Sequence, residues 1–209
     1  MIKSISYNQE EIINNILTLH TDKKIIDADI TYSTGQFYKN GIVPMPNLKY
    51  DIKPQSNDVI AADSRNLPLE SESLSVIIFD PPFLATTGKS LTSNDNNNYI
   101  NKRFGVYPNE QELHQFYVDT LKETYRVLKP NGILIFKCQD KISSGKQYLS
   151  HVFIINEAEK IGYYCKDIFI LLSKSRLVAD WQLKNQKNAR KFHSYFLVLQ
   201  KNNKKIKYI

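Results

Sequence analysis

The run Ser75-Val76-Ile77-Ile78-Phe79 is almost continuously apolar and leads directly into Asp80. A short apolar run of this kind is typical of a strand that is buried on both faces, as in a parallel sheet covered by helices. Two prolines, Pro81 and Pro82, follow at once, and proline ends a strand because it lacks a backbone N–H and fixes φ. The sequence therefore predicts a central parallel strand with a rigid turn at its carboxyl end.

Apolar spacing along the rest of the chain predicts the other elements of such a sheet. Helical spacing recurs at residues 8–19, 110–128 and 149–161. Short apolar runs predict further strands at residues 24–28, 48–50, 58–62, 133–136, 167–172 and 194–199. The segment Lys129-Pro130-Asn131-Gly132 is expected to end the second helix and turn the chain. Strands alternate with helices until the last two strands, so we expect an α/β fold with a doubly wound, mostly parallel sheet that ends in an antiparallel hairpin.

Length and composition favour one intracellular domain. The 209 residues are enough for a single substantial core, so we expect residues 1–209 to form one domain. No apolar run approaches the roughly 20 residues that span a bilayer, and the N-terminus lacks an apolar signal core, which favours a cytoplasmic protein without membrane contact. Cys138 and Cys165 lack metal-ligand spacing and the four histidines are scattered, so no metal site is expected.

Acidic residues end four successive predicted strands. They are Asp27 or Asp29, Asp51, Asp63 and Asp80. Each one alone could be a helix cap. Because the carboxyl ends of parallel strands meet at one edge of a sheet, together they place carboxylates where a nucleoside cofactor would lie.

The turn Asp80-Pro81-Pro82-Phe83 presents groups that suit an aromatic amine. An exocyclic amine of a nucleic-acid base is a poor nucleophile because its lone pair is delocalised into the ring. A carboxylate and a backbone carbonyl together can accept both amine hydrogens, which frees the lone pair. The ring of Phe83 offers a face for stacking a base that has left its helix. This turn therefore indicates a catalytic site for a base amine.

The same turn resembles the catalytic motif of the S-adenosylmethionine-dependent amino-methyltransferases, which act on N6 of adenine or N4 of cytosine in DNA. The resemblance extends over residues 8–200 and is strongest at residues 75–83 and 126–137. It implies a Rossmann-like methyltransferase sheet and S-adenosylmethionine as the cofactor. The catalytic residues that it implies are Asp80, Pro81, Pro82 and Phe83.

The resemblance also implies a cofactor site. The segment Asp29-Ile30-Thr31-Tyr32-Ser33-Thr34-Gly35 is similar to the first cofactor motif of the family, with fewer glycines than usual. Asp51 stands where an acid binds the ribose hydroxyls, and residues 63–68 are similar to the segment whose acid contacts the adenine amine. The cofactor-binding residues implied in this way are Asp29, Tyr32, Thr34, Gly35, Asp51, Ile52, Asp63 and Ser64.

A basic surplus favours a polyanionic partner. The formal net charge is +7, and between Lys174 and Lys191 six Lys or Arg accompany one acid, Asp180. Phosphate contacts are therefore expected at Lys174, Arg176, Lys187, Arg190, Lys191 and His193. No segment matches a separate target-recognition domain, so residues 84–109 and 174–193 are the expected substrate loops. A homodimer or a specificity partner is a further way to recognise the substrate.

Several substrates fit this pattern. Aspartate at the first position favours adenine N6 in DNA, because the cytosine enzymes of the family more often begin the motif with serine. Related small enzymes modify amines in RNA, so RNA stays open, and so does a non-catalytic nucleic-acid-binding subunit. The asparagine- and lysine-rich composition indicates an A/T-rich bacterial or phage genome.

Overall fold

The computed structural model describes residues 1–83, 85, 107–143, 145–175 and 186–202. Within these ranges lie the α-helices α1 (Gln9–His20), α4 (Glu110–Val127) and α5 (Ser150–Ile161) and a short 3₁₀ helix, η1 (Gln36–Tyr38). The strands are β1 (Ile5–Ser6), β2 (Ala28–Asp29), β3 (Leu48–Asp51), β4 (Ile60–Ala61), β5 (Leu74–Phe79), β6 (Leu128–Cys138), β7 (Lys141–Ser143), β8 (Lys146–Tyr148), β9 (Tyr163–Leu172) and β10 (His193–Lys201). None of the described helices is long and apolar enough to cross a membrane.

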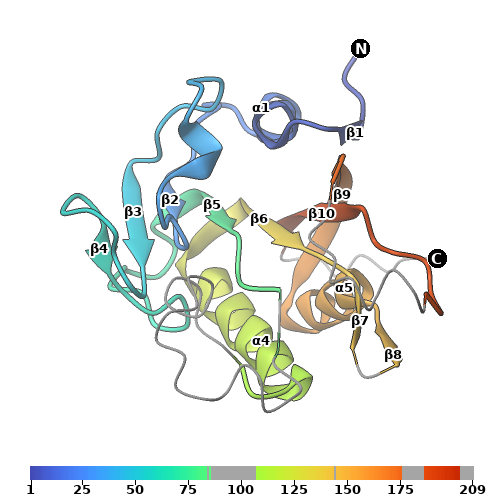
Figure 1. The fold of residues 1–209 in the computed structure, drawn as a ribbon. Helices are drawn as coiled ribbons and strands as arrows, with labels where there is room; N and C mark the ends of the chain where they lie inside the picture. Colours follow the sequence, from blue (N-terminus) through green and yellow to red (C-terminus); the bar gives the residue numbers. More distant parts are fainter. Residues whose placement is uncertain (84, 86–106, 144, 176–185, 203–209) are drawn as a thin grey trace.

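Eight of these strands form one sheet, in the order β1-β9-β10-β6-β5-β2-β3-β4 (Figure 1). β5 pairs in parallel with β2 and β6, and β3 and β4 continue the parallel ladder beyond β2. β10 is antiparallel to both β6 and β9. The prediction of a mostly parallel α/β sheet with an antiparallel hairpin is therefore confirmed.

The sheet is buried on both faces, as β5 shows. Ile77 and Phe79 belong to the core that α4 and α5 cover, whereas Val76 and Ile78 belong to a second core that contains the apolar side of α1. Figure 1 shows α1 on one side of the sheet and α4 with α5 on the other. Alternate side chains of one apolar run thus enter two cores, which is the arrangement predicted for a doubly wound sheet.

β2 covers only Ala28–Asp29, so it overlaps the predicted strand at residues 24–28 at Ala28 alone. Just before β2, the Oδ2 of Asp27 accepts hydrogen bonds from the backbone N–H groups of Ser75 (2.6 Å) and Val76 (3.0 Å). The backbone of Asp27 also bonds to both neighbouring strands, since its N–H donates to the Val76 carbonyl and its carbonyl accepts from the Leu48 N–H, both at 2.9 Å. The paired strand itself starts at Ala28. Between β2 and β5 the chain, described throughout, forms η1 and no α-helix, so the expected strict alternation of strands and helices is wrong for this half.

The predicted turn at Lys129–Gly132 lies inside the bounds of β6. Pairing with β5 jumps from Leu74–Leu128 to Val76–Ile133, and Asn131 has a φ of 65°. Residues 129–132 therefore bulge out of the ladder before regular pairing begins at Ile133, where the strand was expected. β1 and the β7–β8 hairpin were not predicted, because strands of two or three residues leave no periodicity to detect.

The turn after β2 requires a glycine at position 35. Gly35 has a φ of 65°, in the left-handed region, and its N–H donates to the carbonyl of Tyr32 at 2.8 Å. A Cβ atom at this position would lie 2.5 Å from the Tyr32 hydroxyl oxygen. The backbone angle and the close approach of the tyrosine ring therefore both disfavour a larger residue.

Gly35→Ala is expected to destabilise the protein by about 1–3 kcal/mol, because it adds a steric clash to the cost of a left-handed backbone. Gly41→Ala is the matched control, since Gly41 has a φ of 72° and nothing lies within 4 Å of the added Cβ. Denaturant titration measures both free energies of unfolding. Equal losses for the two variants would contradict the clash with Tyr32.

Candidate functional site

A cavity of about 340 Å³ lies at the carboxyl ends of β2, β3 and β5. Its wall is formed largely by residues that follow directly after strands, which is the usual place for ligands in sheets of this class. Three of the acids singled out in the sequence, Asp51, Asp63 and Asp80, line it together. The predicted edge of carboxylates is thus assembled around one space.

Asp51 is held at the end of β3 by two backbone N–H groups. Its Oδ2 accepts from Ser33 and its Oδ1 accepts from Lys53, both at 2.8 Å. Asp51 is buried, whereas its neighbour Ile52 is 59% exposed and lines the same cavity. A fixed carboxylate with remaining acceptor capacity beside an exposed apolar side chain suits a ligand with hydroxyls next to a flat ring.

Asp29 lies behind the cavity wall and does not line it. Its buried carboxylate accepts hydrogen bonds from the Thr31 N–H (3.0 Å) and the Tyr38 hydroxyl (2.8 Å). Burial raises the pKa of Asp29 to about 7. The Oγ1 of Thr31 in turn accepts a hydrogen bond from the Asp80 N–H at 2.7 Å. Asp29 therefore supports the start of the Asp80 turn from below.

Of the other residues in the predicted cofactor motif, Tyr32 lines the cavity but Thr34 and Gly35 do not. The Tyr32 ring is stacked on Tyr38 with 5.6 Å between the ring centroids. Thr34 Oγ1 accepts a hydrogen bond from Gln36 Nε2 at 2.8 Å, and Gln36 lines the cavity. Thr34 and Gly35 thus contact residues that line the cavity but do not line it themselves.

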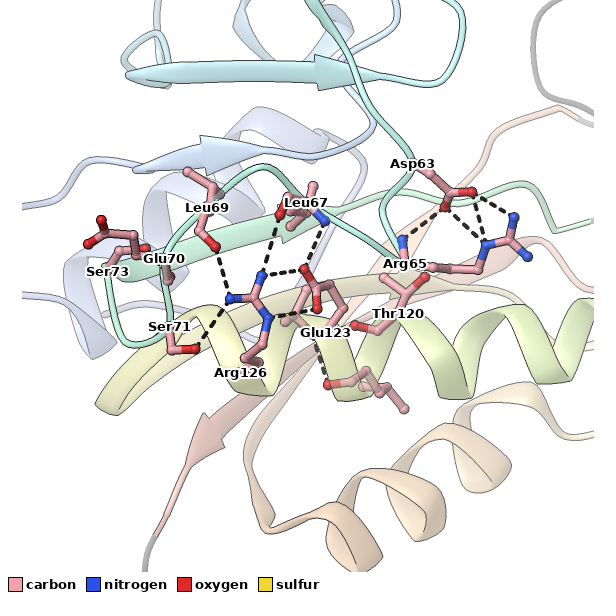
Figure 2. A network of polar contacts seen from close by, with 12 residues as sticks. Asp63, Arg65, Leu67, Leu69, Glu70, Ser71, Ser73, Thr120, Glu123 and Arg126 are labelled. Atoms are coloured by element: carbon pink, nitrogen blue, oxygen red, sulfur yellow. Dashed lines mark hydrogen bonds and ion pairs between the residues drawn. The ribbon is translucent and has the colours of Figure 1, made fainter.

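Asp63 and Ser64 line the cavity between β4 and α4. Arg65 donates to Asp63 from its backbone N–H and from its guanidinium, and these hydrogen bonds lower the pKa of the Asp63 carboxyl (Figure 2). The Oγ of Ser64 lies 3.1 Å from the Oγ1 of Thr120 on α4. Asp63 is therefore an ionised carboxylate whose orientation is set by its neighbour.

Arg126 of α4 fastens the next part of the same segment, as Figure 2 shows. Its guanidinium donates to the backbone carbonyls of Leu67 and Leu69 and pairs with Glu123 at 2.6 Å. Glu123 also accepts from the Leu67 N–H at 2.8 Å. These contacts bind the segment that follows Asp63 to α4, so this wall of the cavity is fixed to the core helix.

The turn Asp80-Pro81-Pro82-Phe83 is also clamped. The Pro82 carbonyl accepts from the Tyr117 hydroxyl at 2.8 Å, and the Phe83 carbonyl accepts from Lys141 Nζ. Lys141 forms a buried ion pair with Glu110, with 2.7 Å between Nζ and Oε2. Asp80 and Pro82 line the cavity, whereas Pro81 and Phe83 do not. Pro81 is buried, and within the described part of the chain its carbonyl accepts no hydrogen bond.

The predicted phosphate contacts lie apart from the cavity wall. Lys187 is exposed, Arg190 and Lys191 are half-buried, and His193 opens β10 with its Nε2 3.0 Å from the Tyr195 hydroxyl. The ammonium of Lys174 lies 5.6 Å from the centre of the Tyr7 ring. Arg176 and most of the predicted loop at residues 84–109 lie outside the described residues.

Several side chains at the site were missed in the sequence. Tyr107 and Phe116 line the cavity with ring centroids 5.0 Å apart, and Lys137 Nζ lies 3.0 Å from Asp80 Oδ2. Phe116 lies within the helix predicted at residues 110–128 but was not singled out as a site residue, and Tyr107 carries no local signal. Lys137 directly follows the predicted strand at residues 133–136, and this position could have indicated a site residue. Among the described residues, no group of three His, Cys, Asp or Glu side chains is placed to hold a metal ion.

Asp29→Asn is expected to change how stability depends on pH. Because burial raises the folded-state pKa from 3.8 to about 7, the folded chain binds this proton more tightly than the unfolded chain. The native free energy of unfolding should therefore fall as pH rises through this window. The variant does not bind this proton, so its free energy of unfolding should not fall for this reason. As pH rises through the window, the difference between the free energies of unfolding should therefore shift by about 2–4 kcal/mol in favour of the variant. Denaturant titrations across the window test this, and a constant difference between the two chains would contradict it.

No protein-family model matches the sequence. Among curated proteins, the chain is 33% identical over 96 residues to the Type II methyltransferase M.HpaI of Haemophilus parainfluenzae. The match covers 46% of the chain and 24% of the relative, so the chain spans about a quarter of that relative's length.

Solved structures of similar fold cover almost the whole chain. A protein described as a sarcosine dimethylglycine methyltransferase from Galdieria sulphuraria aligns with a TM-score of 0.54 and 11% identity, over 93% of this chain and 85% of that one. TrmN from Thermus thermophilus aligns with a TM-score of 0.51 and 14% identity, over 92% of this chain and 48% of that one. The chain therefore has the Rossmann-like methyltransferase fold.

Proposed function

We propose that this chain transfers a methyl group from S-adenosylmethionine to an exocyclic amine of a base in DNA, with adenine N6 as the favoured target. The observation that carries the proposal is the shared cavity, in which Asp80 and Pro82 of the turn meet Asp51 and Asp63 of the neighbouring strands. The partial identity with a type II methyltransferase supports methyl transfer as the reaction. One sheet takes strands from β1 to β10, which supports residues 1–209 acting as a single domain.

The cavity suits a nucleoside cofactor. Its volume of about 340 Å³ lies at the lower end of the range for small-molecule sites, roughly 300–1,000 Å³. Asp51 would accept hydrogen bonds from the ribose hydroxyls, while Ile52 packs on the adenine ring. Asp63 would accept from the adenine amine, with Ser64 beside it. When bound, S-adenosylmethionine supplies an electrophilic methyl group on a sulfonium, and the acids of this wall favour that positive charge.

The turn would activate the target amine by hydrogen bonding. The Asp80 carboxylate and the Pro81 carbonyl would each accept one amine hydrogen, which would free the nitrogen lone pair for in-line attack on the methyl group. The new N–C bond would replace the S–C bond of the donor, which would leave as the thioether, and the surplus amine proton would pass to Asp80 or to water. Pro82 fixes the spacing between these acceptors, since its own carbonyl is held by Tyr117. Phe83 stacks on the base. Placement and electrostatics supply the acceleration, without a covalent enzyme intermediate.

The target base is the finer part of the proposal. Aspartate at the first position of the turn resembles the adenine enzymes, so adenine N6 is favoured over cytosine N4. The basic residues from Lys187 to His193, which lead into β10, would contact phosphates as DNA reaches the cavity. Contacts that add sequence specificity would come from a homodimer or from a partner protein.

Nucleoside mass spectrometry tests the proposed function. The purified chain is incubated with S-adenosylmethionine and unmethylated DNA or RNA, and the digests are searched for methylated bases. We expect N6-methyladenine in DNA. N4-methylcytosine would change the target base, and methylation of RNA alone would change the polymer. If no methylated base forms and calorimetry detects no binding of S-adenosylmethionine, the proposal that the chain is an enzyme is overturned. A non-catalytic nucleic-acid-binding subunit would then be the remaining alternative.

Asp80→Ala is expected to lower the methylation rate at least about 100-fold while cofactor binding stays nearly intact, because it removes an acceptor used by the target amine. Asp22→Ala is the matched control, since Asp22 is an exposed acid remote from the cavity wall. Steady-state kinetics and calorimetry measure the two properties. Equal loss of cofactor binding and transfer would show that Asp80 does not act on the substrate.

Lys187→Ala and Lys191→Ala should each weaken DNA binding for every sequence and reduce the slope of log K against log salt concentration by about 0.9. Lys160→Ala is the control, because Lys160 is an exposed lysine of α5 that pairs with Glu157. Fluorescence anisotropy at several salt concentrations measures the slope. Unchanged slopes in the first two variants would place the DNA path elsewhere.

A further inference from the structure

Lys137 lies at the carboxyl end of β6, directly beside the end of β5. Its Nζ is 3.0 Å from Asp80 Oδ2 and 3.5 Å from Gln9 Oε1, and its side chain is 12% exposed. Asp80 Oδ2 is thereby engaged, which leaves Oδ1 for a hydrogen bond from a ligand. A largely buried, charge-assisted hydrogen bond of this kind fixes the direction of the carboxylate.

Three aromatic rings surround the ammonium of Lys137. The ring centroids of Phe37, Phe196 and Phe83 lie 5.0, 5.6 and 5.8 Å from Nζ, distances at which a cation is attracted to a ring face. Phe37 lines the cavity, and Phe83 belongs to the Asp80 turn. The cation therefore touches the cofactor side and the substrate side of the site at once.

The surroundings of Asp80 are otherwise rich in acids. Asp29 repels it from below, and Asp51 and Asp63 share its cavity. Lys53 is a further cation on the cavity wall, and Arg65 is engaged with Asp63. Among the described residues, Lys137 makes the ion pair with Asp80.

We propose that Lys137 is a positioning residue that holds the Asp80 carboxylate turned so that its Oδ1 accepts a hydrogen from the target amine. This inference rests on the proposed function, because it assigns a role in the same methyl transfer. Lys137 acts through Asp80 and does not contact the reacting atoms.

Lys137→Met keeps the length of the side chain and removes its charge. We expect kcat to fall about 100-fold, as for a misplaced catalytic group, while the KM for S-adenosylmethionine stays nearly constant. Lys166→Met is the matched control, since Lys166 is an exposed lysine of β9.

An Asp80→Asn background separates positioning from general structure. An amide keeps an acceptor oxygen but needs no counter-ion, so Lys137→Met should cost much less activity there than in the native chain. The same loss in both backgrounds, or an unchanged kcat in the single variant, would overturn the inference.

A stability cycle makes the test independent of activity. Free energies of unfolding are measured for the native chain, Lys137→Met, Asp80→Asn and the double variant, and the paired residues should give non-additive changes. If the native chain methylates no nucleic acid, the proposed function fails. If the changes in free energy of unfolding are also additive, the ion pair between Lys137 and Asp80 is overturned too. Methylation by the native chain with additive changes would overturn the inference alone.

Discussion

β5 holds the centre of the sheet, between β2 and β6, and both of its faces are buried in separate cores. Because close-packed cores resist displacement, the carboxyl end of this strand reaches a fixed point at the edge of the sheet. The turn that starts at Asp80 is then held from below by Thr31 and at its carbonyls by Tyr117 and Lys141. Every proposed contact to a target base depends on this placement.

Burying the charged groups that hold the turn costs desolvation free energy. Asp29 is buried with a raised pKa, and burial also lowers the pKa of Lys141 in its pair with Glu110. Replacing a buried ion pair by apolar residues is often neutral or stabilising, so such pairs are weak evidence for stability. Their position beneath and beside the Asp80 turn instead fits a role in keeping the turn in one conformation. Lys137 extends this pattern to the carboxylate itself.

Local sequence signals predicted the parts of the site that follow buried strands. Asp51, Asp63 and Asp80 meet at one cavity because parallel strands bring their carboxyl ends to one edge. Tyr107 could not be placed in this way, because it follows no predicted strand. Lys137 does follow one, at residues 133–136, and was overlooked. Asp29 lies behind the cavity wall, where it is hydrogen-bonded to Thr31 and Tyr38, and no spacing in the sequence reveals these contacts.

The central claim is that the cavity beside the Asp80 turn holds the methyl donor. A crystal structure of the chain with S-adenosylhomocysteine, the demethylated cofactor, tests this most directly. We predict that the ribose hydroxyls contact Asp51, that the adenine lies beside Ile52 and Asp63, and that the sulfur faces Asp80. A ligand bound elsewhere, or one whose sulfur faces away from Asp80, would contradict the account.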